Sequence, residues 1–138
     1  MTRSKTTIEQ QPARRADLKA CPPKAPIAKR SLLADPEAMR LEATFKTLAN
    51  ATRLRLLHAL IREPELCVTE LATAIGMKPQ AVSNQLQRLV DKGILVGRRN
   101  GNQIHYRIVD PCVISLLDQG WCLTDDAGAG DPASESRR

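Results

Sequence analysis

The sequence predicts a mainly α-helical domain with one small β-hairpin, in the winged helix-turn-helix arrangement. Three observations support this fold class. Apolar residues recur at helical spacing in five segments between residues 35 and 124. Two of these segments are short and joined by a glycine-containing turn, as in a helix-turn-helix. An Asn-Gly pair between alternating apolar runs then predicts a hairpin before the last helix.

The two ends of the chain have no apolar period. Residues 1–34 contain four prolines, 8 basic side chains and 2 acidic ones. Residues 125–138 are mostly small and polar, with 2 basic and 4 acidic side chains. Residues 35–124 are nearly balanced, with 11 basic and 9 acidic side chains. We therefore expect a basic disordered arm over 1–34, one folded domain over 35–124 and a disordered tail over 125–138. The arm is either only solvated or also in contact with DNA phosphates.

The first two helices are predicted from their start signals and their apolar stripes. Asp35-Pro36-Glu37 supplies an N-cap, a proline at the first helical position and an acid in the first turn. The second helix follows Asn50 and ends before Pro64. The apolar stripes are Leu41, Phe45 and Leu48 in the first helix and Leu54, Leu57 and Ile61 in the second.

The next two helices form the predicted helix-turn-helix. A short third helix spans residues 67–75 and ends at Gly76, and Pro79 opens a fourth helix with a buried apolar stripe. Amides and arginine on the other face can each make paired hydrogen bonds to base edges in the major groove. An ordinary solvated face is the alternative. The candidate DNA-contacting residues of this segment are Lys78, Gln80, Ser83, Asn84, Gln85, Gln87 and Arg88.

A β-hairpin directly after a recognition helix is a wing. The runs 94–99 and 103–108 flank Asn100-Gly101, and alternating apolar runs around Asn-Gly are typical of a hairpin. The tip carries Arg98, Arg99 and Asn102, where a wing lies along phosphates or in a minor groove. The wing therefore favours DNA binding over the solvated-face alternative.

The last helix begins at the capping pair Asp110-Pro111 and has an apolar stripe that a domain of this size cannot cover alone. We expect the stripe to pack against the same helix of a second protomer, together with part of the first helix, in a two-fold dimer. Such a dimer would bind a palindromic site on double-stranded DNA. The stripe comprises Val113, Leu116, Leu117, Gly120 and Trp121.

Several classes of protein are disfavoured. The chain has no apolar stretch long enough to span a membrane and no apolar signal-peptide segment, so a cytoplasmic location without membrane contact is expected. We expect no enzyme and no organic cofactor, because neither His58 nor His105 neighbours a cysteine and no phosphate-binding loop is present. A protein-interaction module would not explain the polar helix face and basic wing.

The order of elements and four strings resemble the ArsR/SmtB family of bacterial metal-responsive repressors, over about residues 36–120. This resemblance implies a dimeric winged-helix repressor whose operator is released by a metal. The strings are LANATRLRLL at 48–57, ELCVTELA at 65–72, QAVSNQL at 80–86 and His105-Tyr106 in the wing.

Four cysteines, expected as thiols in a reducing compartment, are the candidate metal ligands: Cys21, Cys67, Cys112 and Cys122. The resemblance matches Cys67 to the first thiolate of the cadmium and lead sensors, although Thr69 occupies the position of their second. The same resemblance makes Cys21 a further ligand from the arm. A helix start also favours a thiolate at Cys67, whereas a small buried hydrophobe is the alternative.

The ligand types favour soft ions. Family members that sense zinc use Asp and His on the last helix, and here Asp110 and Cys112 stand near the start of that pattern with no His downstream. Sulfur ligands instead select Cd(II), Pb(II), Hg(II), Cu(I) or As(III), and zinc is accommodated by thiolates plus a carboxylate.

Cys112 and Cys122 are ten residues apart, which in one helix means about 15 Å along the axis and about 80° out of phase. They share an ion only if the helix breaks at Gly120 or if antiparallel pairing brings Cys112 of one protomer to Cys122 of the other. The alternative for this pair is structural packing in an interface.

The predicted function is a repressor that releases its operator when thiolates bind a soft metal or metalloid. The alternatives are a thiol redox switch on the same fold and an effector-independent repressor with structural cysteines.

Overall fold

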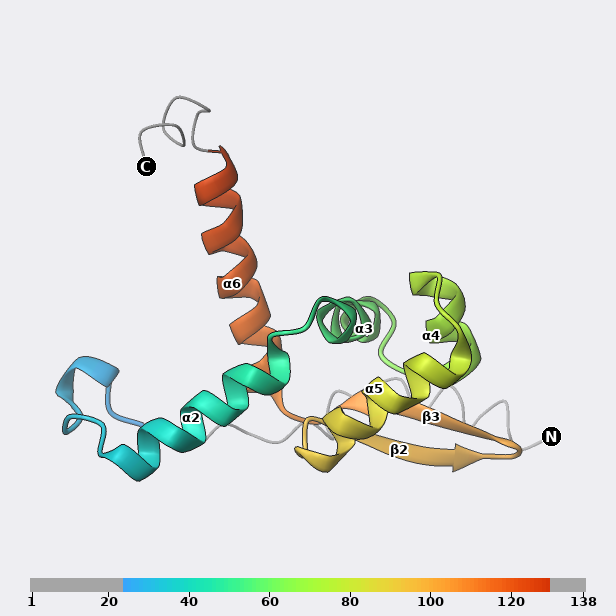
Figure 1. Ribbon diagram of the computed structural model, residues 1–138, viewed down its shortest axis with the longest axis horizontal. Helices are drawn as coiled ribbons and strands as arrows, with labels where there is room; N and C mark the ends of the chain where they lie inside the picture. Colours follow the sequence, from blue (N-terminus) through green and yellow to red (C-terminus); the bar gives the residue numbers. More distant parts are fainter. Residues whose placement is uncertain (1–23, 130–138) are drawn as a thin grey trace.

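The computed structural model describes residues 24–129 and confirms the winged helix-turn-helix arrangement (Figure 1). Five α-helices and a three-stranded antiparallel sheet make up this part of the chain. The elements are η1 (Ile27–Lys29, a 3-10 turn), α2 (Asp35–Leu48), α3 (Ala51–Arg62), β1 (Leu66–Cys67), α4 (Val68–Ile75), α5 (Pro79–Asp91), β2 (Leu95–Asn100), β3 (Gln103–Ile108) and α6 (Pro111–Ala129).

The core lies where α3, α4 and α5 pack together and against the sheet. Each of the three helices buries one apolar stripe and leaves its polar residues outside, as helical spacing requires. Because the core fixes α4 against α5, it also fixes the direction in which the second helix of the helix-turn-helix presents its polar face. The side chains with no exposed surface are Leu56, Leu57, Leu71, Val82, Leu86 and Leu89.

Local capping defines several helix ends. The side chain of Asn50 accepts the Arg53 N–H at 3.0 Å at the start of α3, and Asp110 accepts the Cys112 N–H at 3.0 Å at the start of α6. Gly76 ends α4 with φ 70°, a left-handed conformation that favours glycine. The cap of α2 differs from the prediction. Its N-cap is Ala34, whose N–H donates to Glu37 Oε1 at 3.0 Å, so Asp35 is already helical.

A third strand was not predicted. β1 pairs antiparallel with β3, with Leu66 opposite Tyr106 and Cys67 opposite His105, and the strand order is β1-β3-β2. The third helix of the prediction therefore begins at Val68 and not at Cys67. Two residues are too short to show an alternating pattern, and their pairing partner lies far along the chain, so sequence periodicity could not reveal this strand.

The wing is confirmed as a hairpin, but its turn is shifted by one residue from the prediction. Asn100 pairs with Gln103, so Gly101 and Asn102 form the two-residue loop. Gly101 has φ 68°, and among the described residues only glycines have a positive φ. A glycine with positive φ at the first of the two loop positions is typical of a type II′ turn. A type I′ turn, which Asn-Gly favours, requires a positive φ at both loop positions.

Helices α2 and α6 extend from the core on the side away from the wing tip (Figure 1). Helix α6 continues through Gly120 to Ala129, so the alternative in which the helix breaks at Gly120 is wrong. Only Val109 and Asp110 separate β3 from α6, and the Val109 N–H donates to the Ile94 carbonyl at 3.1 Å. In the described residues, no helix is long and apolar enough to cross a membrane.

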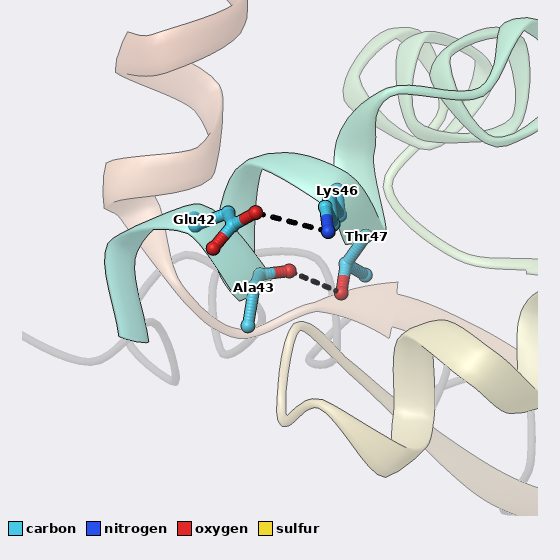
Figure 2. Close-up of polar contacts among 4 residues, drawn as sticks. All are labelled: Glu42, Ala43, Lys46 and Thr47. Carbon is cyan, nitrogen blue, oxygen red and sulfur yellow. Dashed lines mark hydrogen bonds and ion pairs between the residues drawn. The ribbon is translucent and has the colours of Figure 1, made fainter. Parts of the chain in front are cut away.

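Two polar contacts lie along the second half of α2 (Figure 2), and the end of this helix is buried. Lys46 Nζ lies 2.9 Å from Glu42 Oε2 on the exposed face. One residue further on, Thr47 is buried and its hydroxyl donates to the Ala43 carbonyl at 2.9 Å. The predicted stripe of α2 is only partly covered, because Leu48 is buried while Leu41 is 43% and Phe45 is 48% exposed.

Candidate nucleic-acid interface and thiol groups

The exposed face of α5 is made of amides and one arginine. Gln80, Asn84, Gln87 and Arg88 are exposed, as is Lys78 just before the helix, and Ser83 is half-buried. Two side-chain hydrogen bonds run along the helix. Gln80 Nε2 donates to Asn84 Oδ1 at 3.4 Å, and Gln87 Nε2 donates to Asp91 Oδ1 at 2.9 Å. This face is opposite the buried Val82, Leu86 and Leu89 and is accessible to a major groove.

Gln85 differs from the other amides of α5. It is half-buried, and its Oε1 accepts the Arg53 Nε–H at 2.8 Å. The same arginine donates from Nη1 to the Thr47 carbonyl in the last turn of α2. Gln85 therefore has its carbonyl oxygen occupied inside the protein. The Arg53 contact was not predicted, because it joins residues that lie 32 positions apart.

The wing carries positive charge on both faces. Arg98 pairs across the ribbon with His105 and Arg99 with Ile104, and successive side chains of a strand point to opposite faces. Arg98, Arg99 and Asn102 are all exposed, and Arg99 Nη1 donates to the Gly101 carbonyl at 3.4 Å. Residues 92–109 include no acidic side chain. The wing is thus suited to contact phosphates.

The three cysteines in the described residues have different environments, and Cys21 lies outside those residues. Cys67 is a thiol but only 3% exposed, and its N–H donates to Glu70 Oε1 at 2.9 Å at the start of α4. Cys122 on α6 is exposed and is also a thiol. Cys112 is exposed in the first turn of α6 and disulfide-bonded, so the expectation that all four cysteines are thiols is wrong for this one.

The described residues of one protomer do not form a complete metal site by themselves. The described residues contain no group of three or more His, Cys, Asp and Glu side chains that could hold a metal ion. Cys112 and Cys122 lie on one unbroken helix, about 15 Å apart along its axis. The structure therefore leaves these two sulfurs separated within the chain.

An apolar hollow of about 620 Å³ opens between the end of α2, α3 and α6. Trp121 forms part of its wall, is 55% exposed, and lies edge-on to His58 with ring centroids 5.1 Å apart. An exposed apolar surface of this kind typically marks an interface. The hollow is lined by Phe45, Leu48, Ala49, Leu54, His58, Ile61, Leu116, Leu117, Gly120, Trp121 and Thr124.

Comparison with known proteins agrees with this geometry. A family model described as winged helix-turn-helix DNA-binding matches residues 50–96. The arsenic resistance transcriptional regulator ArsR1 of Pseudomonas putida is 42% identical over 90 residues, which cover 59% of this chain and 70% of the relative.

Solved structures extend the similarity. The AntR antimony-specific transcriptional repressor is 58% identical, with a TM-score of 0.69 over 80% of this chain and 99% of that one. The homodimeric winged helix-turn-helix domain Mb0332 of Mycobacterium bovis, a possible ArsR-family regulator, is 32% identical. Its TM-score is 0.58, over 70% of this chain and 92% of that one.

The fold, the polar face of α5, the basic wing and these relatives lead to one conclusion. This chain is no enzyme but belongs to the ArsR/SmtB family of metal-responsive, DNA-binding winged helix-turn-helix transcriptional repressors.

Proposed function

We propose that this repressor releases its operator when thiolates bind a soft metal or metalloid ion shared between two protomers. The ligands are Cys112 of one protomer, in its reduced form, and Cys122 of the partner subunit. The observation that carries this proposal is the unbroken helix α6, which exposes both cysteines but keeps them about 15 Å apart within one chain. An ion that needs both sulfurs therefore has to bridge two copies of α6.

Helix α6 carries its two cysteines and its apolar residues on different faces. If two antiparallel α6 helices bring Cys112 to Cys122 of the partner subunit, the two-fold axis passes beside the residue midway between them, which is Leu117. Leu117 lines the apolar hollow together with Leu116 and Trp121. At about 100° per residue, however, both cysteines lie on the face of α6 away from Leu117, so the pairing that joins the thiols does not itself cover the apolar hollow. The similar domain Mb0332 is homodimeric, which supports a dimer for this chain as well.

The donor atoms favour soft ions. Both proposed ligands are sulfur, which selects As(III), Sb(III), Cd(II), Pb(II) or Hg(II), whereas zinc would also require a carboxylate. The similar proteins ArsR1 and AntR are named for arsenic and antimony, so the trivalent metalloids are the first ions to test. Cys67 is disfavoured as a ligand because it is buried at the start of α4, and Cys21 is a candidate third ligand.

Release follows from thermodynamic linkage. If the ion binds more tightly to the DNA-free dimer, operator affinity falls by the same coupling energy, about 1 to 3 kcal/mol or roughly 5- to 150-fold. The path from ligand to DNA is short, because Cys112 is the second residue of α6 and two residues separate α6 from the wing strand β3. Binding also displaces thiol protons, so the ion affinity should fall as the pH is lowered.

For the operator itself, the exposed face of α5 is assigned to the base edges and the wing to the backbone. Gln80, Asn84, Gln87 and Arg88 contact bases in the major groove, with Ser83 at the edge of that face. The remaining candidate contacts, to phosphates or the minor groove, come from Lys78, Arg98, Arg99 and Asn102.

A mixed dimer tests the shared site. Cys112→Ser and Cys122→Ser homodimers should each lose the ultraviolet sulfur-to-metal absorption seen when the reduced wild type is titrated with As(III), Sb(III) or Cd(II). A purified heterodimer of the two variants retains one intact pair of Cys112 and Cys122 across the interface. It should therefore recover half of the wild-type stoichiometry, and Cys67→Ser should bind normally.

Three results would contradict the proposal. A heterodimer with no absorption would place the ligands within one protomer. Loss of absorption in Cys67→Ser would place the site at the start of α4. No absorption with any soft ion in the wild type would leave a DNA-binding repressor without this effector.

A thiol redox switch is the second candidate function, because Cys112 is disulfide-bonded and therefore has a second sulfur within bonding reach. Disulfide formation converts two thiols into one S–S bond, with two protons and two electrons passing to an oxidant such as a peroxide. Loss of operator binding with hydrogen peroxide, reversed by dithiothreitol and unaffected by soft ions, would favour this function over metal sensing.

A further inference from the structure

We propose that Arg53 is a positioning residue that sets the orientation of the recognition helix α5 relative to α2. The inference rests on the DNA binding of the family and is independent of the identity of the effector. Its starting observation is that one arginine side chain bonds two helices besides its own. Arg53 lies in the first turn of α3, donates from Nε to Gln85 Oε1 on α5 at 2.8 Å, and donates from Nη1 to the Thr47 carbonyl on α2.

Each partner of Arg53 suits a fixed link. The Thr47 carbonyl belongs to the last turn of α2, where carbonyl groups have no partner within the helix and accept from a cationic donor. Gln85 neighbours Leu86, which has no exposed surface, so the amide is held at the boundary between the core and the polar face. The guanidinium is planar and donates in fixed directions, so it constrains the positions of both acceptors.

The link acts on the angle at which α5 enters a groove. Base contacts from Asn84 and Gln87 depend on the rotation of α5 about its axis, and Gln85 lies between them in sequence. Because Arg53 holds Gln85, it also holds this rotation. The other end of the link is the last turn of α2, where Leu48 lines the apolar hollow, so the link joins α5 to the wall of that hollow.

Gln85 has a different role in this arrangement from the base contact that the sequence predicts. From the sequence, Gln85 was a candidate base-contacting residue, because an amide on a recognition helix can pair with adenine. In the structure its amide oxygen already accepts from Arg53, whereas Asn84 is exposed on the same helix. We therefore expect Gln85 to support specificity through Arg53 and Asn84 to support it by direct contact.

The experiment uses the full chain and a duplex selected by the wild type from a random library. Affinity for this duplex and for a scrambled one is measured by fluorescence anisotropy over salt concentrations of about 50 to 200 mM. The link variants are Arg53→Lys, Arg53→Ala, Gln85→Ala and the double mutant Arg53→Lys/Gln85→Ala. Asn84→Ala tests a direct contact, and Arg62→Lys is a matched control on α3. Folded fraction and melting temperature are measured in parallel.

Each variant of the link should lower affinity for the selected duplex about tenfold, equivalent to about 1.4 kcal/mol. Affinity for the scrambled duplex and the salt slope should stay unchanged, because no phosphate contact is removed. The double mutant should be no weaker than the weaker single variant, since both lose the same link. Arg62→Lys should match the wild type, and only Asn84→Ala should relax the preference at one base position.

Specific outcomes would overturn the inference. If Gln85→Ala relaxes one base position and its effect adds to that of Arg53→Lys, Gln85 contacts a base directly. If Arg53→Ala lowers the salt slope by about 0.9 while Arg53→Lys restores affinity, Arg53 is a phosphate contact. If both link variants lower only the melting temperature and keep the wild-type specificity ratio, their role is stability alone.

Discussion

The imidazole of His58 and the indole of Trp121 meet edge to face, with ring centroids 5.1 Å apart and planes inclined by 69°. This geometry matches the preferred arrangement of aromatic pairs. It is a contact between α3, which belongs to the core, and α6, which extends away from it. Trp121 nevertheless stays 55% exposed, so most of the indole is available to a second protomer.

We therefore predict that Trp121→Ala weakens the dimer. Buried tryptophans at interface centres typically contribute about 2 kcal/mol or more, so the dimer dissociation constant should rise about 30-fold or more. Sedimentation equilibrium at several protein concentrations measures the change. Trp121→Phe, which keeps an aromatic edge, should have a smaller effect, and an unchanged dissociation constant in Trp121→Ala would place the interface elsewhere.

A second prediction concerns the core beneath the recognition helix. Leu86 has no exposed surface, so Leu86→Ala should lower the free energy of unfolding by about 2 to 5 kcal/mol through lost burial and a residual cavity. The neighbouring exposed Gln87 gives the control, since Gln87→Ala should change stability by less than about 0.5 kcal/mol. Urea denaturation followed by circular dichroism measures both values. Equal effects of the two variants would contradict the packing described for α5.

A third prediction separates backbone contact from base recognition at the wing. Arg99→Ala should weaken binding to all duplexes alike and lower the magnitude of the salt slope by about 0.9. The base preferences of the selected site should stay as in the wild type, because phosphate contacts do not distinguish bases. Anisotropy titrations at several salt concentrations decide the matter. A steep slope retained in Arg99→Ala would show that this arginine does not contact a phosphate.

A fourth prediction tests the close packing inside the wing. A Cβ atom at Gly97 would lie 2.9 Å from Ile104 Cγ2 and 3.2 Å from Tyr106 Cε1. Gly97→Ala should therefore destabilise the chain by about 1 to 3 kcal/mol. Adding Ile104→Ala removes the nearer atom and should recover part of the loss. Thermal unfolding of the single and double variants measures this recovery, and equal melting temperatures would show that Ile104 is not the obstacle.

The elements that sequence reasoning identified are those with local causes. Asp110 caps α6 through the N–H two residues ahead, and Gly76 ends α4 by its own left-handed conformation. The exposed Phe45 of α2 also follows from the sequence, because the predicted apolar stripe was expected to need a second protomer. These features depend on residues within a few positions of each other, which a sequence pattern records directly.

The features that the sequence did not reveal depend on contacts between distant segments. β1 exists because Leu66 and Cys67 meet β3, and Gln85 turns towards Arg53 across 32 positions. Helical spacing places Gln85 beside the apolar stripe, three residues after Val82 and four before Leu89, but no local signal identifies Arg53 as its partner. The shift of the hairpin loop has a similar origin. The pairing of β2 with β3, which places Asn100 opposite Gln103, sets the position of the loop, and the Asn-Gly pair does not set it.

The two-residue connection between β3 and α6 sets a condition on how this protein can evolve. Val109 and Asp110 leave no spare length between the wing and the helix that bears the cysteines, and hydrogen bonds hold the chain on both sides. Cysteines can therefore be lost, gained or moved along α6 while the connection to the DNA-binding wing stays the same. If α6 holds the effector as proposed, a lineage with this junction could exchange one ligand specificity for another without rebuilding its response, whereas an inserted residue at the junction would separate ligand binding from DNA release.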